Sequence, residues 1–240
     1  MIKVENLSLS FEDKKLFENV SIEIPNNKIT VVAGPNGTGK TTLLKVMAGV
    51  ETAENSIIDS DFKEIFFLPQ RLKYPENITL FDYISSCYFK NGFKWFLTEE
   101  EKNQINTVLE ELEISDRKNV FVEKLSSGEL QKANIGMALI SGADCLMLDE
   151  PTSNMDLVNQ IKILNLVKNL TKRGITIVMV LHDLNLAANF GDFFVGTNPQ
   201  KKLICLNKDT FFDEKNLENI FGIKFKVIKN DEKINVQISN

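Results

Sequence analysis

A glycine-rich run at residues 34–41, GPNGTGKT, constrains the fold of this chain more than any other segment. It fits G-x-x-x-x-G-K-[ST], in which glycines let the backbone curl so that successive N–H groups point at phosphate oxygens. Residues 28–33 (KITVVA) predict a strand entering the loop, and residues 42–50 (TLLKVMAGV) predict a helix leaving it. A phosphate would then lie at a helix N-terminus, where orphan N–H groups and the dipole favour negative charge. A chance glycine-rich turn is the alternative, and the flanking strand and helix argue against it.

The side chains that follow the glycines extend this phosphate site. Lys40 would reach the β- and γ-phosphates of a nucleotide as a point charge, and the Thr41 hydroxyl would ligate Mg²⁺. The residues predicted to bind the nucleotide in this segment are Gly34, Pro35, Asn36, Gly37, Thr38, Gly39, Lys40, Thr41 and Thr42.

Length and composition limit the class of protein. The chain has 240 residues, which is long enough for one large domain or for one domain with an inserted lobe. Its net charge of −5 argues against a broad surface for nucleic acid. Cys87, Cys145 and Cys205 lack metal-ligand spacing and predict a reducing compartment. The first ten residues read as a strand rather than a signal peptide, and the apolar runs are shorter than the ~18 residues of a membrane span.

The periodicity of apolar residues changes along the chain from strand-like to helical and then to an alternation of both. Thr98 and Glu101 have the spacing of a capping box at the start of one helix. The expected strands are 2–11, 17–24, 28–33, 65–68, 145–148, 175–181, 193–195 and 202–206, with turns at 12–15 and 197–201. The expected helices are 42–50, 79–90, one beginning after Thr98, 127–140, 157–170 and 184–190.

This order predicts an α/β fold of the phosphate-loop type, with a mostly parallel sheet, an N-terminal antiparallel β subdomain and an inserted helical subdomain. We expect one domain, in which residues 1–74 and 141–206 form the nucleotide-binding core with the β subdomain. Residues 75–140 would form the helical subdomain, and residues 207–240 a C-terminal extension. Ligands in such sheets lie beyond the carboxyl ends of the strands.

Polar residues follow three of the expected strands. Asp149 is suited to hold Mg²⁺ through a water, and Glu150 to polarise the water that attacks the γ-phosphate. His182, the only histidine, would reach the γ-phosphate from the same edge, and Gln70 would touch Mg²⁺ or the attacking water. Solvated carboxylates, a structural histidine and a chance loop glutamine are the alternatives.

The run LSSGE at residues 125–129 offers a hydroxyl and free N–H groups at the start of a helix. Taken alone, the run is an N-cap.

Taken in order, these segments resemble the nucleotide-binding domain of the ATP-binding cassette (ABC) family over nearly the whole chain. Phe11 stands where that family usually has an aromatic residue that stacks on adenine. The run 34–41 resembles the Walker A loop, CLMLDE at 145–150 the Walker B motif, Gln70 the Q-loop glutamine, LSSGE at 125–129 the signature, SNMD at 153–156 the D-loop, and His182 the switch histidine.

The resemblance implies an ATPase that uses ATP and Mg²⁺ and works as a dimer with a second copy or a related cassette. The signature of one cassette, here Ser126, Ser127, Gly128 and Glu129, would close over ATP on the other, with Asp156 also at the nucleotide. The partners implied are integral membrane permease subunits and, indirectly, a substrate-binding protein, with no nucleic acid. The location implied is peripheral, at the cytoplasmic face of the cell membrane.

Two positions depart from the family pattern, and one segment suggests a subgroup. Ser127 replaces a glycine, which restricts positive φ and adds bulk, and Phe11 replaces the commoner tyrosine. HDLNLAA at 182–188, with the tail 217–228, resembles the ATPase subunits of bacterial importers for iron–siderophore, haem and cobalamin. The alternatives are a soluble non-transport cassette ATPase such as an iron–sulfur cluster assembly factor, a translation factor with paired cassettes, and a small-molecule kinase.

Overall fold

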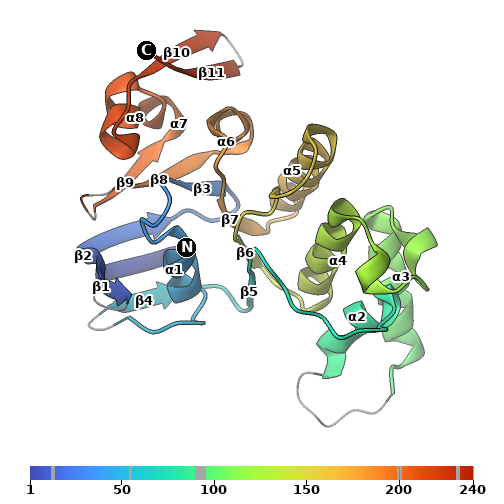
Figure 1. The fold of residues 1–240 in the computed structure, drawn as a ribbon. Coiled ribbons are helices and arrows are strands. Elements are labelled where there is room, and N and C mark those ends of the chain that lie inside the picture. The colour runs from blue at the N-terminus through green and yellow to red at the C-terminus, as the bar shows by residue number, and fades with distance from the viewer. Residues whose placement is uncertain are drawn as a thin grey trace. The chain divides into compact units, whose positions relative to one another are not determined.

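The computed structural model describes residues 1–11, 14–53, 56–89, 96–198, 200, 202–230 and 233–239, without the side chains of Phe11 and Lys14 (Figure 1). The chain divides into two compact units, and each is described by itself. The first comprises Met1–Pro69, Asp144–Pro151 and Asn165–Asn240, and the second Gln70–Ala143 and Thr152–Leu164. The segment 75–140 lies within the second unit, and the segment 207–240 belongs to the first.

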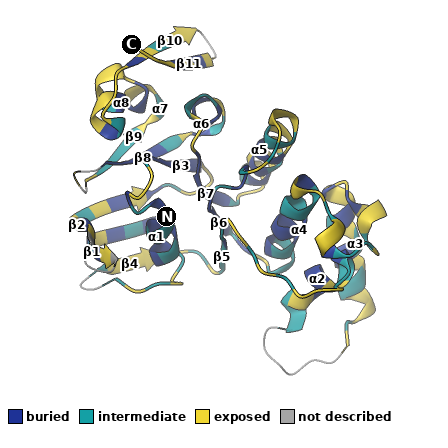
Figure 2. Cartoon of the chain, in the orientation of Figure 1, coloured by how far each residue is buried: buried dark blue, intermediate teal, exposed yellow. Residues whose placement is uncertain are grey.

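A six-stranded sheet, counted over the described residues, organises the first unit. Its order is β5-β6-β7-β3-β8-β9, with parallel pairing throughout except between β8 and β9. Every residue of the inner strands β3, β6 and β7 is buried, which explains why these strands read as mostly apolar runs without alternation (Figure 2). The strands are β3 (Ile29–Ala33), β5 (Ile65–Leu68), β6 (Cys145–Leu148), β7 (Thr176–Val180), β8 (Phe193–Thr197) and β9 (Leu203–Asn207).

A separate antiparallel sheet of order β2-β1-β4 confirms the expected N-terminal β subdomain. It contains β1 (Ile2–Phe11), β2 (Lys14–Ile24) and β4 (Ile57–Ser60). Register shifts interrupt the β1–β2 pairing near Asn6, which has a left-handed φ of 55°. The strand β4 was not expected, because its four residues are all exposed or half-buried and carry no alternation.

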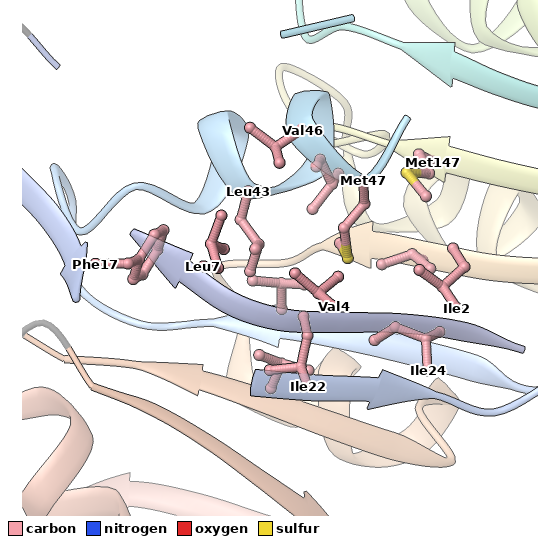
Figure 3. Packing of buried hydrophobic residues seen from close by; sticks show 14 of the residues in the cluster. Ile2, Val4, Leu7, Phe17, Ile22, Ile24, Leu43, Val46, Met47 and Met147 are labelled. Carbon is pink, nitrogen blue, oxygen red and sulfur yellow. The ribbon is translucent and has the colours of Figure 1, made fainter. Parts of the chain in front are cut away.

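The helix α1 (Lys40–Met47) contributes to a core that includes residues of both sheets. Leu43 and Met47 lie beside Val4 and Leu7 of β1 in Figure 3, and Met147 of β6 belongs to the same cluster. Burying an aliphatic side chain of this size stabilises a fold by roughly 1.5–3 kcal/mol. This packing therefore fixes α1, and with it the loop that precedes it.

The second unit is helical. Its elements are α2 (Leu80–Ser85), 3₁₀ turns at Ser86–Phe89, Ser115–Arg117 and Val122–Lys124, α3 (Glu99–Glu111), α4 (Ser127–Ile140) and the first half of α5 (Leu157–Lys172). The expected capping box is confirmed, since Thr98 Oγ1 accepts from the Glu101 N–H and the Glu101 carboxylate accepts from the Thr98 N–H. The helix expected at 127–140 has those bounds.

Several boundaries differ from the expectations. The helix after the phosphate loop is shifted, because α1 begins at Lys40 and ends at Met47. The expected turn at 197–201 is wrong at Thr197, which is the last residue of β8 and pairs with Leu203. Helix α2 ends at Ser85, and residue 90 lies outside the described residues.

The C-terminal segment is more regular than expected. After α6 (Leu184–Phe190), as expected, come α7 (Lys208–Phe211), α8 (Glu214–Phe221) and a hairpin of β10 (Phe225–Asn230) and β11 (Lys233–Ile238). Among the described residues, no helix has the length and apolar character needed to cross a membrane.

Candidate functional site

The phosphate-loop segment joins β3, at the centre of the parallel sheet, to the N-terminus of α1. Gly37 and Gly39 have φ values of 72° and 90°, which are left-handed conformations that glycine adopts without steric cost. A Cβ on Gly39 would also lie 3.0 Å from the buried Phe17 ring. The glycine spacing is therefore a requirement of the backbone, and the first N–H groups of α1 face the loop.

The Lys40 ammonium is held against the loop. Its Nζ donates to the carbonyl oxygens of Gly34 at 2.9 Å and Pro35 at 2.8 Å, and the residue is 7% exposed. Burial lowers the pKa of Lys40, while the negative charges of Glu150 and Asp149 oppose that shift. A buried cation needs such partners, because removing an unpaired charge from water is costly.

Thr41 and Asp149 lie in direct contact. The Thr41 hydroxyl donates toward both carboxylate oxygens of Asp149, at 3.0 and 2.9 Å. Asp149 is 5% exposed and directly follows β6, where its backbone N–H donates to the Leu68 carbonyl at 2.9 Å. Two oxygen-bearing side chains that were separately predicted to hold Mg²⁺ are thus brought together.

Glu150 and His182 form a second pair at the same edge. Glu150 Oε1 lies 2.5 Å from His182 Nε2, and the side chains are 21% and 45% exposed. Glu150 has a φ of 52°, a left-handed conformation that costs a non-glycine residue on the order of 1–3 kcal/mol and is common at active sites. The sequence placed both residues at this edge but did not predict their contact.

The signature-like residues begin α4 in the second unit. Ser126 caps the helix, and its hydroxyl donates to Glu129 Oε2 at 2.8 Å, while Arg117 Nε donates to the other carboxylate oxygen at 2.7 Å. Ser127 is the first residue of α4 and is not among the residues with positive φ. A serine there meets no conformational restriction, so the expected restriction on positive φ does not apply.

Asp156 lies near that helix start, within the second unit. Its carboxylate accepts from the Asn159 backbone N–H at 2.9 Å and from the Asn159 amide at 2.6 Å. The Asn159 side chain in turn lies beside Gly128, within 3.5 Å of where a Cβ would be. Ser126, Glu129 and Asn159 also line a hollow of about 280 Å³ that includes Lys132 and Lys162.

The remaining predicted site residues are less informative. Gln70 is exposed and is the first residue of the second unit. Asn36 is exposed, and Thr42 is half-buried within α1. The Phe11 side chain lies outside the described residues, so adenine stacking by Phe11 stays a prediction.

Sequence reasoning missed two residues that contact or adjoin the predicted site segments. Thr197, fully buried at the end of β8, contacts Thr38 of the phosphate loop, and Asn185, three residues after His182, bonds to β11. The sequence did offer one signal for Thr197, because it is a polar residue at the end of a strand. Nothing in the local sequence indicates the partner of Asn185.

Comparisons with known proteins give a consistent result. A family model described as "ABC transporter" matches residues 17–153. The iron(3+)-hydroxamate import ATP-binding protein FhuC of Bacillus subtilis (strain 168) is 35% identical over 209 residues, covering 81% of this chain and 77% of that protein. The petrobactin import ATP-binding protein YclP of the same organism is 33% identical, covering 81% and 82%.

A third relative and a solved structure extend the comparison. The manganese transport system ATP-binding protein MntB of Listeria monocytogenes is 32% identical over 228 residues, covering 89% of this chain and 93% of that protein. A chain of an ABC transporter solved in an inward-facing conformation superposes with a TM-score of 0.88 at 22% identity, covering 99% and 96%. That likeness shows the fold.

Proposed function

This chain belongs to the ABC transporter family and is an ATP-binding subunit that hydrolyses ATP, and on that premise we propose that it is the motor of a bacterial importer for a metal chelate. A ferric siderophore is the first choice of cargo, ahead of haem and cobalamin. The observation that carries the assignment of the site is the cluster at the carboxyl edge of the parallel sheet. There the phosphate loop, Asp149, Glu150 and His182 come together.

The loop residues 34–42 would hold the phosphates of ATP through backbone N–H groups and the Lys40 ammonium. Thr41 and Asp149 fit Mg²⁺, since both offer oxygen donors, which hard cations prefer. Among the described residues no cluster of three or more carboxylate, histidine or cysteine side chains could hold a metal alone. Mg²⁺ would neutralise charge on the phosphates, and Gln70 would supply a further oxygen.

Glu150 is the proposed general base for the attacking water, because its carboxylate is partly exposed at the edge where the γ-phosphate would lie. His182 contacts that carboxylate through Nε2 and would orient it. Because a neutral imidazole has one N–H, His182 would donate either to this carboxylate or, when nucleotide is bound, to the γ-phosphate. The role of Lys40 is to stabilise charge on the phosphates.

A second copy of the chain, or a related cassette, would complete the site. The start of α4, with Ser126 to Glu129, presents N–H groups that favour an anion, and Asp156 lies in the same unit. We propose that this surface of one copy covers the ATP on the other. The dimer would dock on integral membrane permease subunits at the cytoplasmic face, with a substrate-binding protein delivering the cargo.

The choice of cargo rests on the relatives. Two of the three relatives above are named for import of an iron(3+)-hydroxamate and of petrobactin, and the third for manganese transport. The segment 182–188 and the tail 217–228 favour the chelate group. Transport of a free metal ion, as named for the manganese relative, is the second candidate.

Uptake measurements test the cargo. A deletion strain should lose most uptake of labelled ferric siderophore while growing normally on abundant free iron. The wild-type chain should restore uptake and Glu150→Gln should not, which ties uptake to hydrolysis. Loss of labelled manganese uptake alone would favour the second candidate. Unchanged uptake of siderophore, haem and cobalamin would refute the chelate assignment and leave the ATPase assignment intact.

Co-purification separates a transporter subunit from a soluble cassette ATPase. A tagged chain extracted from detergent-solubilised membranes should bring an integral membrane protein with it. Recovery of all of the chain in the soluble fraction, with no membrane protein bound, would favour the soluble alternative.

A further inference from the structure

A buried threonine at the end of β8 contacts the phosphate loop from behind. Thr197 is fully buried, and its hydroxyl oxygen lies 2.6 Å from that of Thr38, which is 8% exposed. A Cβ added to Gly34 would overlap both the hydroxyl and the carbonyl oxygen of Thr197. The strand end is therefore packed against the loop at two points, Gly34 and Thr38.

The hydrogen bonds around Thr38 have a definite direction. The Thr38 hydroxyl has one proton, and it donates that proton to the Pro35 carbonyl at 2.8 Å. Thr38 Oγ1 is then the acceptor in its contact with Thr197, so the Thr197 hydroxyl is the donor. Within the described residues, the other acceptor near the Thr197 hydroxyl is the Ala33 carbonyl, which is farther away at 3.5 Å.

This series of hydrogen bonds ends at Lys40. The Pro35 carbonyl that accepts from Thr38 also accepts from Lys40 Nζ at 2.8 Å. A carbonyl oxygen has two lone pairs and can accept both donors. The order of contacts is therefore Thr197 to Thr38, Thr38 to the Pro35 carbonyl, and that carbonyl to the Lys40 ammonium.

We propose that Thr197 is a positioning residue for the phosphate loop, which holds Thr38, the Pro35 carbonyl and through them Lys40 in the arrangement that receives nucleotide. Thr197 touches no substrate and acts through the loop. These bonds join protein atoms only, so they would hold the loop without help from nucleotide, which would lower the entropic cost of binding. The inference rests on the proposed assignment of nucleotide phosphates to this loop.

Thr30 offers a matched control in the same sheet. It is also a fully buried threonine, on β3, but its hydroxyl has no hydrogen-bond partner within the described part of the chain. Replacing either residue by valine removes a hydroxyl with little change of shape. Only at Thr197 does the replacement remove a bond to the phosphate loop.

The experiment compares Thr197→Val, Thr197→Ser and Thr30→Val with the full-length wild type. Thr197→Val should weaken ATP binding about tenfold, the factor that one buried hydrogen bond corresponds to. It should also speed hydrogen exchange of the backbone amides of residues 34 and 36–41 in nucleotide-free protein, without a matching change elsewhere in the first unit. Thr197→Ser, which keeps the hydroxyl, should restore both quantities, and Thr30→Val should change neither.

A double variant tests the route. If Thr197 acts through Thr38, Thr38→Val with Thr197→Val should bind ATP no more weakly than Thr38→Val alone. If the two substitutions instead cause additive losses of ATP affinity, Thr197 does not act through Thr38. Amide hydrogen exchange that rises uniformly across the first unit would contradict this mechanism as well. ATP affinity equal to that of Thr30→Val would overturn the proposal itself. Wild-type protein that fails to bind ATP would instead refute the proposed nucleotide site, and the exchange measurement would still decide whether Thr197 holds the loop.

Discussion

At the scale of single residues, Glu150 combines an unfavourable backbone conformation with a side-chain contact to which we assign a catalytic role. Its left-handed φ of 52° is a conformation that glycine adopts more easily, and its carboxylate contacts His182. The chain retains a carboxylate there at a cost in stability. This agrees with the general tendency of active sites to contain strained residues.

Glu150→Gln should stop ATP hydrolysis while ATP still binds. The amide keeps the shape and a hydrogen-bonding group but cannot accept the proton of the attacking water, so we expect kcat to fall about 10²-fold or more. Phosphate release under single-turnover conditions measures hydrolysis, and nucleotide fluorescence measures binding. Glu51→Gln, which alters a partly exposed ion pair with Lys45, is the control and should leave kcat unchanged. A Glu150→Gln protein with wild-type turnover would exclude the general-base role.

The strain at Glu150 gives a second prediction at this scale. Glu150→Gly should be about 1 kcal/mol more stable than Glu150→Ala, because alanine is disfavoured at positive φ. At Glu218, exposed within α8, the order should reverse, because glycine is about 1 kcal/mol worse than alanine inside a helix. Urea denaturation of the four variants measures both differences. The same order at both sites would mean that Glu150 is not strained.

At the scale of elements, helix α6 is tied to the C-terminal hairpin by one side chain. The Asn185 amide accepts from the Val236 N–H at 2.8 Å and donates to the Val236 carbonyl at 3.3 Å. Ile234 and Val236 are buried alternately along β11. Asp183 caps this helix and directly follows His182, so the hairpin is joined to the helix that begins two residues after the histidine.

Asn185→Ala should destabilise the protein by about 1–3 kcal/mol, because it removes both bonds to Val236 and leaves polar backbone atoms unpaired. Chemical denaturation measures the loss. Asn189→Ala is the control and should cost much less, because Asn189 is exposed on the same helix and its side chain bonds to the Asn185 carbonyl rather than to the hairpin. Equal losses for the two variants would mean that the hairpin contact contributes little.

Local signals explain which elements were predictable. The capping box at Thr98, the bounds of α4 and the glycine spacing of the phosphate loop depend on residues close in sequence, and these were predicted well. The strand β4, the contact of Glu150 with His182 and the burial of Thr197 depend on partners far along the chain. Such pairings are decided by tertiary packing, which no local pattern encodes.

At the scale of the whole molecule, the chain passes between the two units at four points, after Pro69, Ala143, Pro151 and Leu164. The first lies immediately before Gln70, and the third lies one residue beyond the Asp149–Glu150 pair. Residues at the edge of the parallel sheet are therefore close in sequence to the segments that connect the two units. Any movement of one unit against the other would involve those segments.

Cysteine reactivity should report the integrity of the first unit. Burial raises the pKa of the Cys145 thiol to about 12 and that of Cys205 to about 11, so little thiolate is present at pH 8. Iodoacetamide at pH 8 should therefore modify both slowly in the folded protein and rapidly in denaturant. Mass spectrometry of digests measures each site, with Cys145→Ser as the assignment control. Rapid modification of Cys145 without denaturant would show that β6 opens readily.

The Pro35 carbonyl accepts hydrogen bonds from both the Lys40 ammonium and the Thr38 hydroxyl. When the ammonium turns toward a phosphate, that carbonyl keeps Thr38 as its donor and does not become an unpaired buried acceptor. The ammonium would exchange the carbonyl oxygens of Gly34 and Pro35 for phosphate oxygens. A nucleotide that draws Lys40 away would therefore remove the bond from Lys40 to the Gly34 carbonyl but leave the Pro35 carbonyl paired.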